Sequence, residues 1–136
     1  MRKVIVNEFM SLDGVAQAPG AGDEDPSGGF AHGGWHMQYM ADELAQNSTL
    51  LEGEAAAVAA LKQENRGDLH VIGSIELVRT LIEHDLVDEF RLMIDPVVLG
   101  GGKRMFRDDG LLMQLRLVDG QVTGTGAFLA TYAPVA

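Results

Sequence analysis

The stretch Leu69–Phe106, LHVIGSIELVRTLIEHDLVDEFRLMIDPVVLGGGKRMF, decides the fold. It begins with a short apolar run, Leu69–Ile72, which predicts a buried strand. A glycine and a serine then mark a tight turn into Ile75–His84, where the apolar residues share one stripe of a helix. The run Asp88–Leu99 is again rich in strand-forming residues, and Pro96 within it predicts a bend or a position at an edge. A strand, a helix and a strand in this order predict an α/β fold.

The sequence on either side of this stretch supplies further strands. Val4–Val6 is a continuous β-branched run, which predicts a strand covered on both faces. Toward the C-terminus, Leu115 and Leu117 alternate with polar neighbours, two glycines mark a turn, and Ala127–Tyr132 predicts a last strand. Because strands and helices alternate first and hairpins come last, we expect a mostly parallel sheet with an antiparallel C-terminal edge.

A long loop and two predicted helices lie between the first strand and the decisive stretch. Ser11–Gly34 is rich in glycine and lacks periodicity, and loops of this length inside a domain are either functional or disordered. Trp35–Gln46 has apolar residues at helical spacing, and Glu52–Asn65 is rich in alanine, glutamate and leucine, so both predict helices. Leu50–Leu51 allows only a very short strand. The length fits a single domain spanning residues 1–136.

Charge and composition exclude several classes of protein. Ten lysines and arginines against twenty aspartates and glutamates give a net charge of −10, without a basic run. Nucleic acids and anionic membrane surfaces are therefore unfavourable partners. Cysteine is absent, which excludes disulfides, a zinc-thiolate site and a cysteine nucleophile. The apolar stretches are too short for a signal peptide or a membrane span, so we expect a cytoplasmic protein.

One candidate binding motif is Gly73-Ser74, where a predicted strand opens into a helix. Free backbone amides and the helix dipole favour an anion such as phosphate at such a place. An equally good interpretation is that Gly73 permits the tight turn and Ser74 caps the helix.

Two further motifs favour a structural interpretation. The loop Leu99–Phe106 has three glycines and two cations after a strand, but it lacks the spacing of a Walker loop, so a reversal between strands is favoured. His32 and His36 are spaced as a helical metal-binding pair would be. Two glycines between them disfavour a helix and no glutamate joins them, so we expect no metal site.

A candidate acid lies on the first predicted helix. Asp42 and Glu43 follow the aromatic residues Trp35 and Tyr39, so either carboxyl group could donate a proton to a substrate ring. A solvated acidic helix face is the favoured alternative.

Four segments taken together resemble a known family. The resemblance is to bacterial proteins similar to the C-terminal reductase domain of the bifunctional riboflavin biosynthesis protein, within the dihydrofolate reductase-like superfamily. Its most specific feature is the order Gly-Ser before a helix, then Leu-Val-Asp-Glu, then Pro-Val-x-Leu-Gly-x-Gly-Lys. The resemblance implies a three-layer αβα sandwich with a mostly parallel sheet, truncated on one side. The segments are Val4–Gly14 (VIVNEFMSLDG), His32–Tyr39 (HGGWHMQY), Leu69–Ser74 (LHVIGS) and Leu77–Phe106 (LVRTLIEHDLVDEFRLMIDPVVLGGGKRMF).

The resemblance also implies a function. It implies an NADPH-dependent reductase of a small heterocyclic or sugar-linked substrate, similar to 5-amino-6-(5-phosphoribosylamino)uracil reductase or dihydrofolate reductase, and usually a homodimer. The matching residues are Gly73, Ser74 and Ile75 at the turn that holds the cofactor pyrophosphate, Leu12, Asp13 and Gly14 in the loop beside the nicotinamide, Trp35 and Tyr39 at the substrate cleft, and Asp42 as a candidate catalytic acid.

The chain departs from this family in one place. The relatives carry a strand ending in Gly-Arg, a threonine-bearing helix and another strand where this chain runs from Ala45 straight to Asn47. That unit grips the 2′-phosphate in the family, so its absence predicts NADPH binding at least about tenfold weaker. A non-catalytic module for nucleotide or small-ligand binding, or for dimerisation, is therefore the alternative function. The absence also makes Leu69–Ile72 an edge strand, which we expect Leu50–Leu51 or a second subunit to cover.

Overall fold

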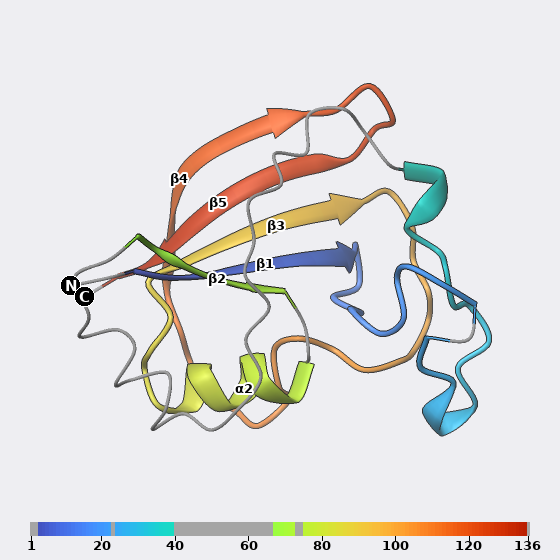
Figure 1. Cartoon of the computed structure of the whole chain (residues 1–136), viewed down its shortest axis with the longest axis horizontal. Helices are drawn as coiled ribbons and strands as arrows, with labels where there is room; N and C mark the ends of the chain where they lie inside the picture. Colours follow the sequence, from blue (N-terminus) through green and yellow to red (C-terminus); the bar gives the residue numbers. More distant parts are fainter. Residues whose placement is uncertain (1–2, 23, 40–66, 73–74, 136) are drawn as a thin grey trace.

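The chain folds around one mixed five-stranded sheet (Figure 1). The computed structural model describes residues 3–22, 24–39, 67–72 and 75–135. β1 lies inside the sheet and pairs in parallel with both β2 and β3, and β5 pairs antiparallel with β3 and with β4. In spatial order the strands are β2 (Leu69–Ile72), β1 (Val4–Ser11), β3 (Glu89–Asp95), β5 (Phe128–Pro134) and β4 (Leu115–Val122).

The decisive stretch contains the predicted strand, helix and strand, although β3 (Glu89–Asp95) is shorter than the predicted run Asp88–Leu99. β2 covers the predicted strand, and the helix α2 (Ile75–Glu83) is the next described element. β3 ends at Asp95 because the next residue, Pro96, has no amide hydrogen to donate to the ladder. β3 lies between β1 and β5 rather than at an edge. Within the described ranges, no helix is long and apolar enough to cross a membrane.

The expected mostly parallel sheet is not confirmed. Of the four strand pairings described, two are parallel and two are antiparallel. The reason is that β4 and β5 form a hairpin, which joins only antiparallel strands, and its turn is closed by the amide of Thr123 donating to the carbonyl of Ala127. The predicted antiparallel C-terminal edge is confirmed.

The expected three-layer arrangement is not confirmed. α2 covers one face of the sheet (Figure 1), and the described residues include no second helical layer. β2 is an edge strand of the sheet as described. Leu50–Leu51 lies outside the described residues, so the covering of this edge stays a prediction.

The main core lies between α2 and the sheet. The alternation of side chains along β1 and β3 directs Val4, Val6 and Phe90 toward the helix, and each is completely buried. Burying a side chain of this size stabilises the fold by about 1.5–3 kcal/mol. The helix contributes its inner stripe, Leu77, Val78 and Leu81.

The predicted helix Trp35–Gln46 is wrong over its first five residues. There the chain forms turns and the single 3-10 turn Met37–Tyr39. The amides of Gly34 and His36 donate to the distant carbonyls of Ala18 and Pro19 instead of to carbonyls four residues back. Apolar spacing cannot reveal this competition. The remainder of the predicted helix, residues 40–46, lies outside the described part.

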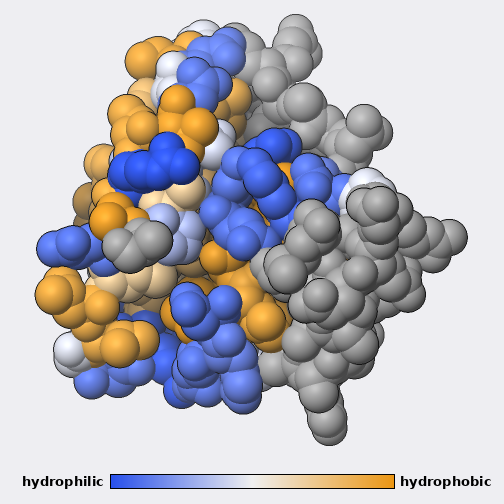
Figure 2. Space-filling model, turned by 90° about the vertical axis from the view of Figure 1, so that its left-hand side faces the viewer, coloured by the Kyte–Doolittle hydropathy of each residue, from blue (hydrophilic) through white to orange (hydrophobic). Residues whose placement is uncertain are grey.

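β4 is an exposed edge strand. Leu117, Val118 and Val122 are all exposed, and the pairing with β5 shifts register between Leu117 and Asp119 as a β-bulge. Figure 2 views the molecule from the side of the two termini, where apolar side chains gather along one border with hydrophilic ones among them.

The core yields a first prediction. Replacing Phe90 by alanine should lower the free energy of unfolding by about 3–5 kcal/mol, because a completely buried ring leaves a cavity. Replacing its exposed neighbour Arg91 by alanine should cost less than about 1 kcal/mol. Urea denaturation measures both. Equal losses for the two variants would contradict the core as described.

Candidate functional site

The candidate site lies at the carboxyl ends of β1 and β3. These parallel strands end in register at Ser11 and Asp95, and a long loop follows each. The two loops are joined by an antiparallel bridge between Val15 and Arg104. The amide of Leu12 also donates to the carbonyl of Val97 at 2.9 Å. Such an edge of parallel strands is where α/β proteins bind ligands.

The carboxylate of Asp13 fixes the start of both loops. One oxygen accepts from the Ser11 hydroxyl at 2.5 Å and from the Leu99 amide at 3.2 Å, and the other accepts from the Gly100 amide at 2.9 Å. The Ser11 hydroxyl is the main cause that lowers the pKa of Asp13 to about 2, against an opposing effect of desolvation. The amides of Gly100 and Leu99 lower the pKa further. Asp13 is therefore charged and fully engaged at neutral pH.

The buried side chain of Gln17 joins the middle of the two loops. Its amide nitrogen donates to the carbonyls of Asp25 at 2.9 Å and Ser27 at 3.0 Å, and its amide oxygen accepts from the Lys103 amide at 2.9 Å. Its backbone carbonyl accepts from the indole of Trp35 at 2.8 Å. One residue thus holds four separate parts of the chain together.

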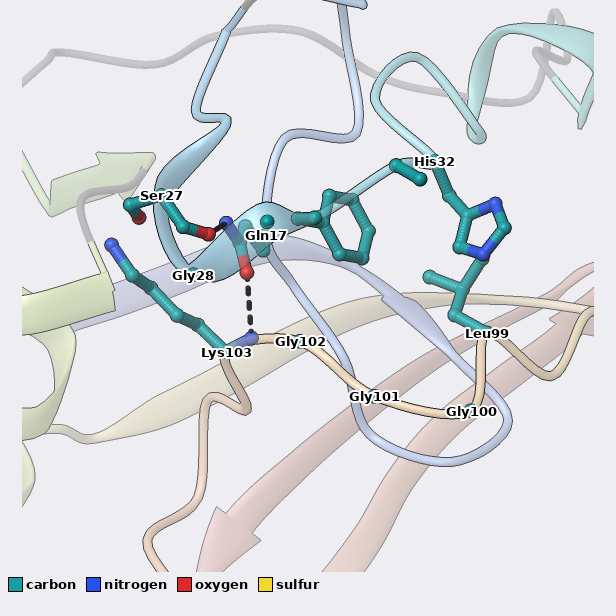
Figure 3. Close-up of a pocket in the computed structure, with 12 residues that line it drawn as sticks. Gln17, Ser27, Gly28, His32, Leu99, Gly100, Gly101, Gly102 and Lys103 are labelled. Carbon is teal, nitrogen blue, oxygen red and sulfur yellow. Dashed lines mark hydrogen bonds between the residues drawn. The ribbon is translucent and has the colours of Figure 1, made fainter.

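A cavity of about 440 Å³ lies between these loops (Figure 3). Its walls come from residues 27–32 of the first loop and residues 99–103 of the second, with Gln17 between them. At its border the ammonium group of Lys103 contacts the carboxylate of Asp25 at 2.8 Å. Hydrogen bonds from Lys103 first, and then from Ser27, hold the pKa of Asp25 at about 2. The pair is therefore ionised and mutually neutralised at neutral pH.

A buried histidine and aspartate form a second polar pair. His36 Nδ1 lies 2.7 Å from Asp95 Oδ2, and both side chains are almost completely buried. The imidazole is stacked on the ring of Phe9, with centroids 3.7 Å apart. Among the described residues, His36 Nε2 and Asp95 Oδ1 are buried without a hydrogen-bond partner. Leaving such atoms unpaired costs about 1–3 kcal/mol each.

The structure separates the predicted cofactor residues into two places. Leu12 is exposed and Gly14 adopts a left-handed backbone conformation, with φ of 83°, in the loop after β1. Ile75, in contrast, is the first residue of the helix α2. Gly73 and Ser74 lie outside the described residues, so their predicted role is neither supported nor opposed.

The predicted substrate residues have structural contacts. Trp35 is buried and its indole anchors the first loop to Gln17. The carbonyl of Tyr39 accepts a hydrogen bond from the Thr125 hydroxyl at 2.8 Å. Asp42 lies outside the described residues, so its position beside these aromatic residues stays a prediction.

Two further sequence predictions concern metal binding and the loop Leu99–Phe106. In the described ranges, no group of three or more histidine, aspartate or glutamate side chains could hold a metal ion. The loop Leu99–Phe106 does reverse the chain after β3, as the structural interpretation predicted, and it also lines the cavity.

Sequence reasoning missed Gln17, His36 and Asp95. The available signal for Asp95 was an acidic residue directly before proline, at the end of a buried strand. His36 was considered only as a partner of His32. Nothing in the sequence marks Gln17 as buried, because its partners lie 8 to 86 residues away.

Asp13 yields a prediction about pH. Its folded pKa of about 2 lies below the unfolded value of about 3.9, so the carboxylate contributes stability that is present above pH ~4 and lost as the pH falls toward 2. Asp13→Asn should lose stability less steeply than the wild type over this window. At pH 7 it should be less stable by about 1 kcal/mol, allowing for solvent screening. Urea denaturation at several pH values measures this, and the exposed Asp119→Asn serves as the control. If Asp13→Asn and the wild type lost stability equally steeply as the pH falls, the proposed role of the Asp13 carboxylate in holding the loops would be refuted.

The buried pair yields a double-mutant prediction. His36→Leu should cost about 3–5 kcal/mol because it leaves the Asp95 carboxylate buried and unpaired. His36→Leu combined with Asp95→Leu should cost less than the sum of the two single changes. Thermal and urea denaturation supply the values, with the exposed Met37→Ala as control. Strictly additive losses would show that the two side chains are not coupled.

Two proteins of Bacillus subtilis (strain 168) are similar to this chain. YyaP is 37% identical over 86 residues, which are 63% of this chain and 44% of YyaP. YwjB is 39% identical over 66 residues, which are 48% of this chain and 38% of YwjB. The matched region therefore spans less than half the length of either relative.

Several solved structures share the fold. A pyrimidine reductase-like protein from Corynebacterium diphtheriae has a TM-score of 0.65 at 11% identity, over 99% of this chain and 92% of that one. A diaminohydroxyphosphoribosylaminopyrimidine deaminase/5-amino-6-(5-phosphoribosylamino)uracil reductase from Thermotoga maritima has a TM-score of 0.54 at 10% identity, over 98% and 57% of the two chains. Dihydrofolate reductase from Enterococcus faecalis, solved with NADP(H), has a TM-score of 0.54 at 12% identity, over 98% and 97%.

The family model of the RibD C-terminal domain matches residues 52–129, which are more than half of the chain. This match includes α2, β3, the glycine loop and most of the C-terminal hairpin. The chain therefore belongs to the RibD C-terminal domain family and has the α/β fold of the dihydrofolate reductase-like proteins.

Proposed function

We propose that this protein is an NADPH-dependent reductase of a small heterocyclic or sugar-linked substrate. The proposed reaction is similar to that of 5-amino-6-(5-phosphoribosylamino)uracil reductase or dihydrofolate reductase. The observation that carries the proposal is the match to the RibD C-terminal domain family. The position of the two joined loops at the carboxyl ends of parallel strands supports it, because ligands of α/β proteins bind there.

The described residues fit a dinucleotide in two respects. α2 begins at Ile75, and the first amides of a helix are free to donate to phosphate oxygens. The exposed side chain of Leu12 gives the loop after β1 an apolar group that can pack against a ring. NADPH would supply the hydride, and the protein would supply binding and orientation.

The chain's own residues take the following proposed roles. Gly73, Ser74 and Ile75 bind the pyrophosphate, and Leu12 and Gly14 shape the place beside the nicotinamide. Asp13 holds that loop in place, since its carboxylate is already engaged by the Ser11 hydroxyl and two amides. Trp35 and Tyr39 lie on the substrate side, and Asp42 is the candidate proton donor. We further propose a single cytoplasmic domain over residues 1–136 that forms a homodimer.

The alternative is a non-catalytic module that binds a nucleotide or small ligand, or that only dimerises. The resemblance to the family favours it, because it implies a strand-helix-strand unit at a place where this chain runs from Ala45 straight to Asn47. The unit would grip the 2′-phosphate of NADPH with charge-assisted hydrogen bonds. The two proposals therefore differ in the affinity for this cofactor.

Titration with NADPH separates the two functions. Trp35 is the only tryptophan, so energy transfer from its emission to the reduced nicotinamide reports binding directly. A Kd tighter than about 100 μM, or about −5.5 kcal/mol, is the expected result for the reductase. Absence of binding at millimolar NADPH would exclude the reductase and favour the module.

A matched pair of variants tests the proposed pyrophosphate site. Ser74→Glu puts a negative charge before α2 and should weaken NADPH binding at least about tenfold, because like charges repel at the helix start. His84→Glu adds the same charge just after the other end of α2 and should leave the affinity unchanged. Equal affinities for both variants and the wild type would show that the cofactor pyrophosphate does not bind at the start of α2.

A further inference from the structure

β4 forms an open border of the sheet. Seven of its eight residues are exposed, and β5 is its only strand partner in the described sheet. It lies at the border opposite to β2 and away from α2 (Figure 1). Within the described ranges, the core cluster that contains the α2 residues takes its buried members from β1, β2 and β3, but none from β4 or β5. An edge of this kind is open to a partner.

The open border carries apolar side chains. Leu117 is 56% exposed and Val118 is 46% exposed. Leu117 stands opposite Tyr132 of β5, which stands opposite Phe90 of β3, and residues that stand opposite each other share a face. Leu117 therefore lies on the face that α2 covers, but beyond the reach of the helix. Apolar groups exposed at such a place favour contact with another protein surface.

The bulge in β4 brings two opposite charges to one face. Arg116 and Asp119 are three residues apart, so in a regular strand they would point to opposite faces. Across the bulge, Arg116 pairs with Ala133 and Asp119 pairs with Thr131, which are two residues apart on β5. Both charges therefore lie on the face away from α2. Both are exposed, and neither has an ion-pair partner among the residues that the structure describes.

The segment Arg116–Asp119 is complementary to itself in the antiparallel direction. When two copies lie side by side about a twofold axis between Leu117 and Val118, Arg116 of each copy opposes Asp119 of the other. The same register puts Leu117 opposite Val118. A shift by one residue in either direction would break both ion pairs and put a leucine against the carboxylate, so this register is favoured.

We propose that two copies of this chain pack antiparallel along β4, with Leu117 and Val118 at the centre and an Arg116–Asp119 ion pair on either side. A second copy is the partner because the same strand supplies the matching charges and apolar groups. The twofold axis closes the pair, so no third copy is added. Side chains make the contact, since the bulge interrupts the backbone row. This inference rests on the proposed homodimer but not on the reductase activity.

Charge reversal tests the contact by sedimentation velocity. The wild type should be a dimer. Arg116→Glu and Asp119→Arg each put like charges opposite each other and should raise the dimer dissociation constant at least about tenfold. The double variant Arg116→Glu/Asp119→Arg restores both ion pairs in reverse and should recover the dimer. Asp108→Arg, which reverses an exposed carboxylate outside β4, is the matched control and should leave the dimer unchanged.

Mixing the two single variants tests the twofold register. In a heterodimer of Arg116→Glu with Asp119→Arg, both positions again carry opposite charges, so the mixture should form dimers that neither variant forms alone. Neither side chain has an ion-pair partner within its own described chain. Both single variants should therefore have the wild-type free energy of unfolding when urea denaturation is measured at dilutions that separate the copies.

The remaining outcomes separate this inference from the proposed function. A wild type that is monomeric at about 100 μM, a dimer that both single variants retain, or a mixture that stays monomeric would overturn the contact. Dimerisation that follows the charge pattern, in a protein that binds no NADPH, would support this surface and refute the reductase. NADPH binding by a monomeric wild type would support the reductase and refute the surface.

Discussion

The hydrogen bonds of the buried Gln17 side chain are the interaction on which the candidate site depends. The loop after β1 has little regular structure, so its backbone polar groups need partners from elsewhere. Gln17 supplies them for Asp25, Ser27 and Lys103, and its carbonyl fixes the indole of Trp35. The two loops therefore form one unit that is anchored at the ends of two parallel strands. A cavity whose walls come from both loops keeps its shape only while this unit is intact.

The strand-helix-strand core was predictable because its signals are local. β2 and α2 follow directly from a short apolar run and an apolar stripe, and β3 ends where proline removes a donor. The balance of parallel and antiparallel pairing was less predictable, since it depends on where the C-terminal hairpin attaches. The spacing of Trp35 and Tyr39 predicted a helix, but the neighbouring amides of Gly34 and His36 donate to distant carbonyls, and the amide of Tyr39 donates three residues back. Side-chain periodicity gives no information about such backbone partners.

The site was predictable in outline but not in detail. Sequence reasoning gave Asp13 and the glycine loop as separate motifs, yet the carboxylate of one binds amides of the other across 87 residues. The pairing of His36 with Asp95 spans 59 residues and has no sequence spacing of its own. Both contacts form because the parallel register of β1 and β3 brings the two loops together. The sheet thus determines the chemistry at its edge, and a single sequence does not reveal that register.

The bulge in β4 has a consequence for the protein's solubility. An edge strand that exposes leucine and valine side chains would ordinarily offer a straight row of amides and carbonyls to any extended chain. Here the register shift between Leu117 and Asp119 interrupts that row and bends the strand. Arg116 and Asp119 add charge on either side of the interruption. The outer border of the sheet is therefore a poor template for open-ended strand addition, in spite of its apolar side chains.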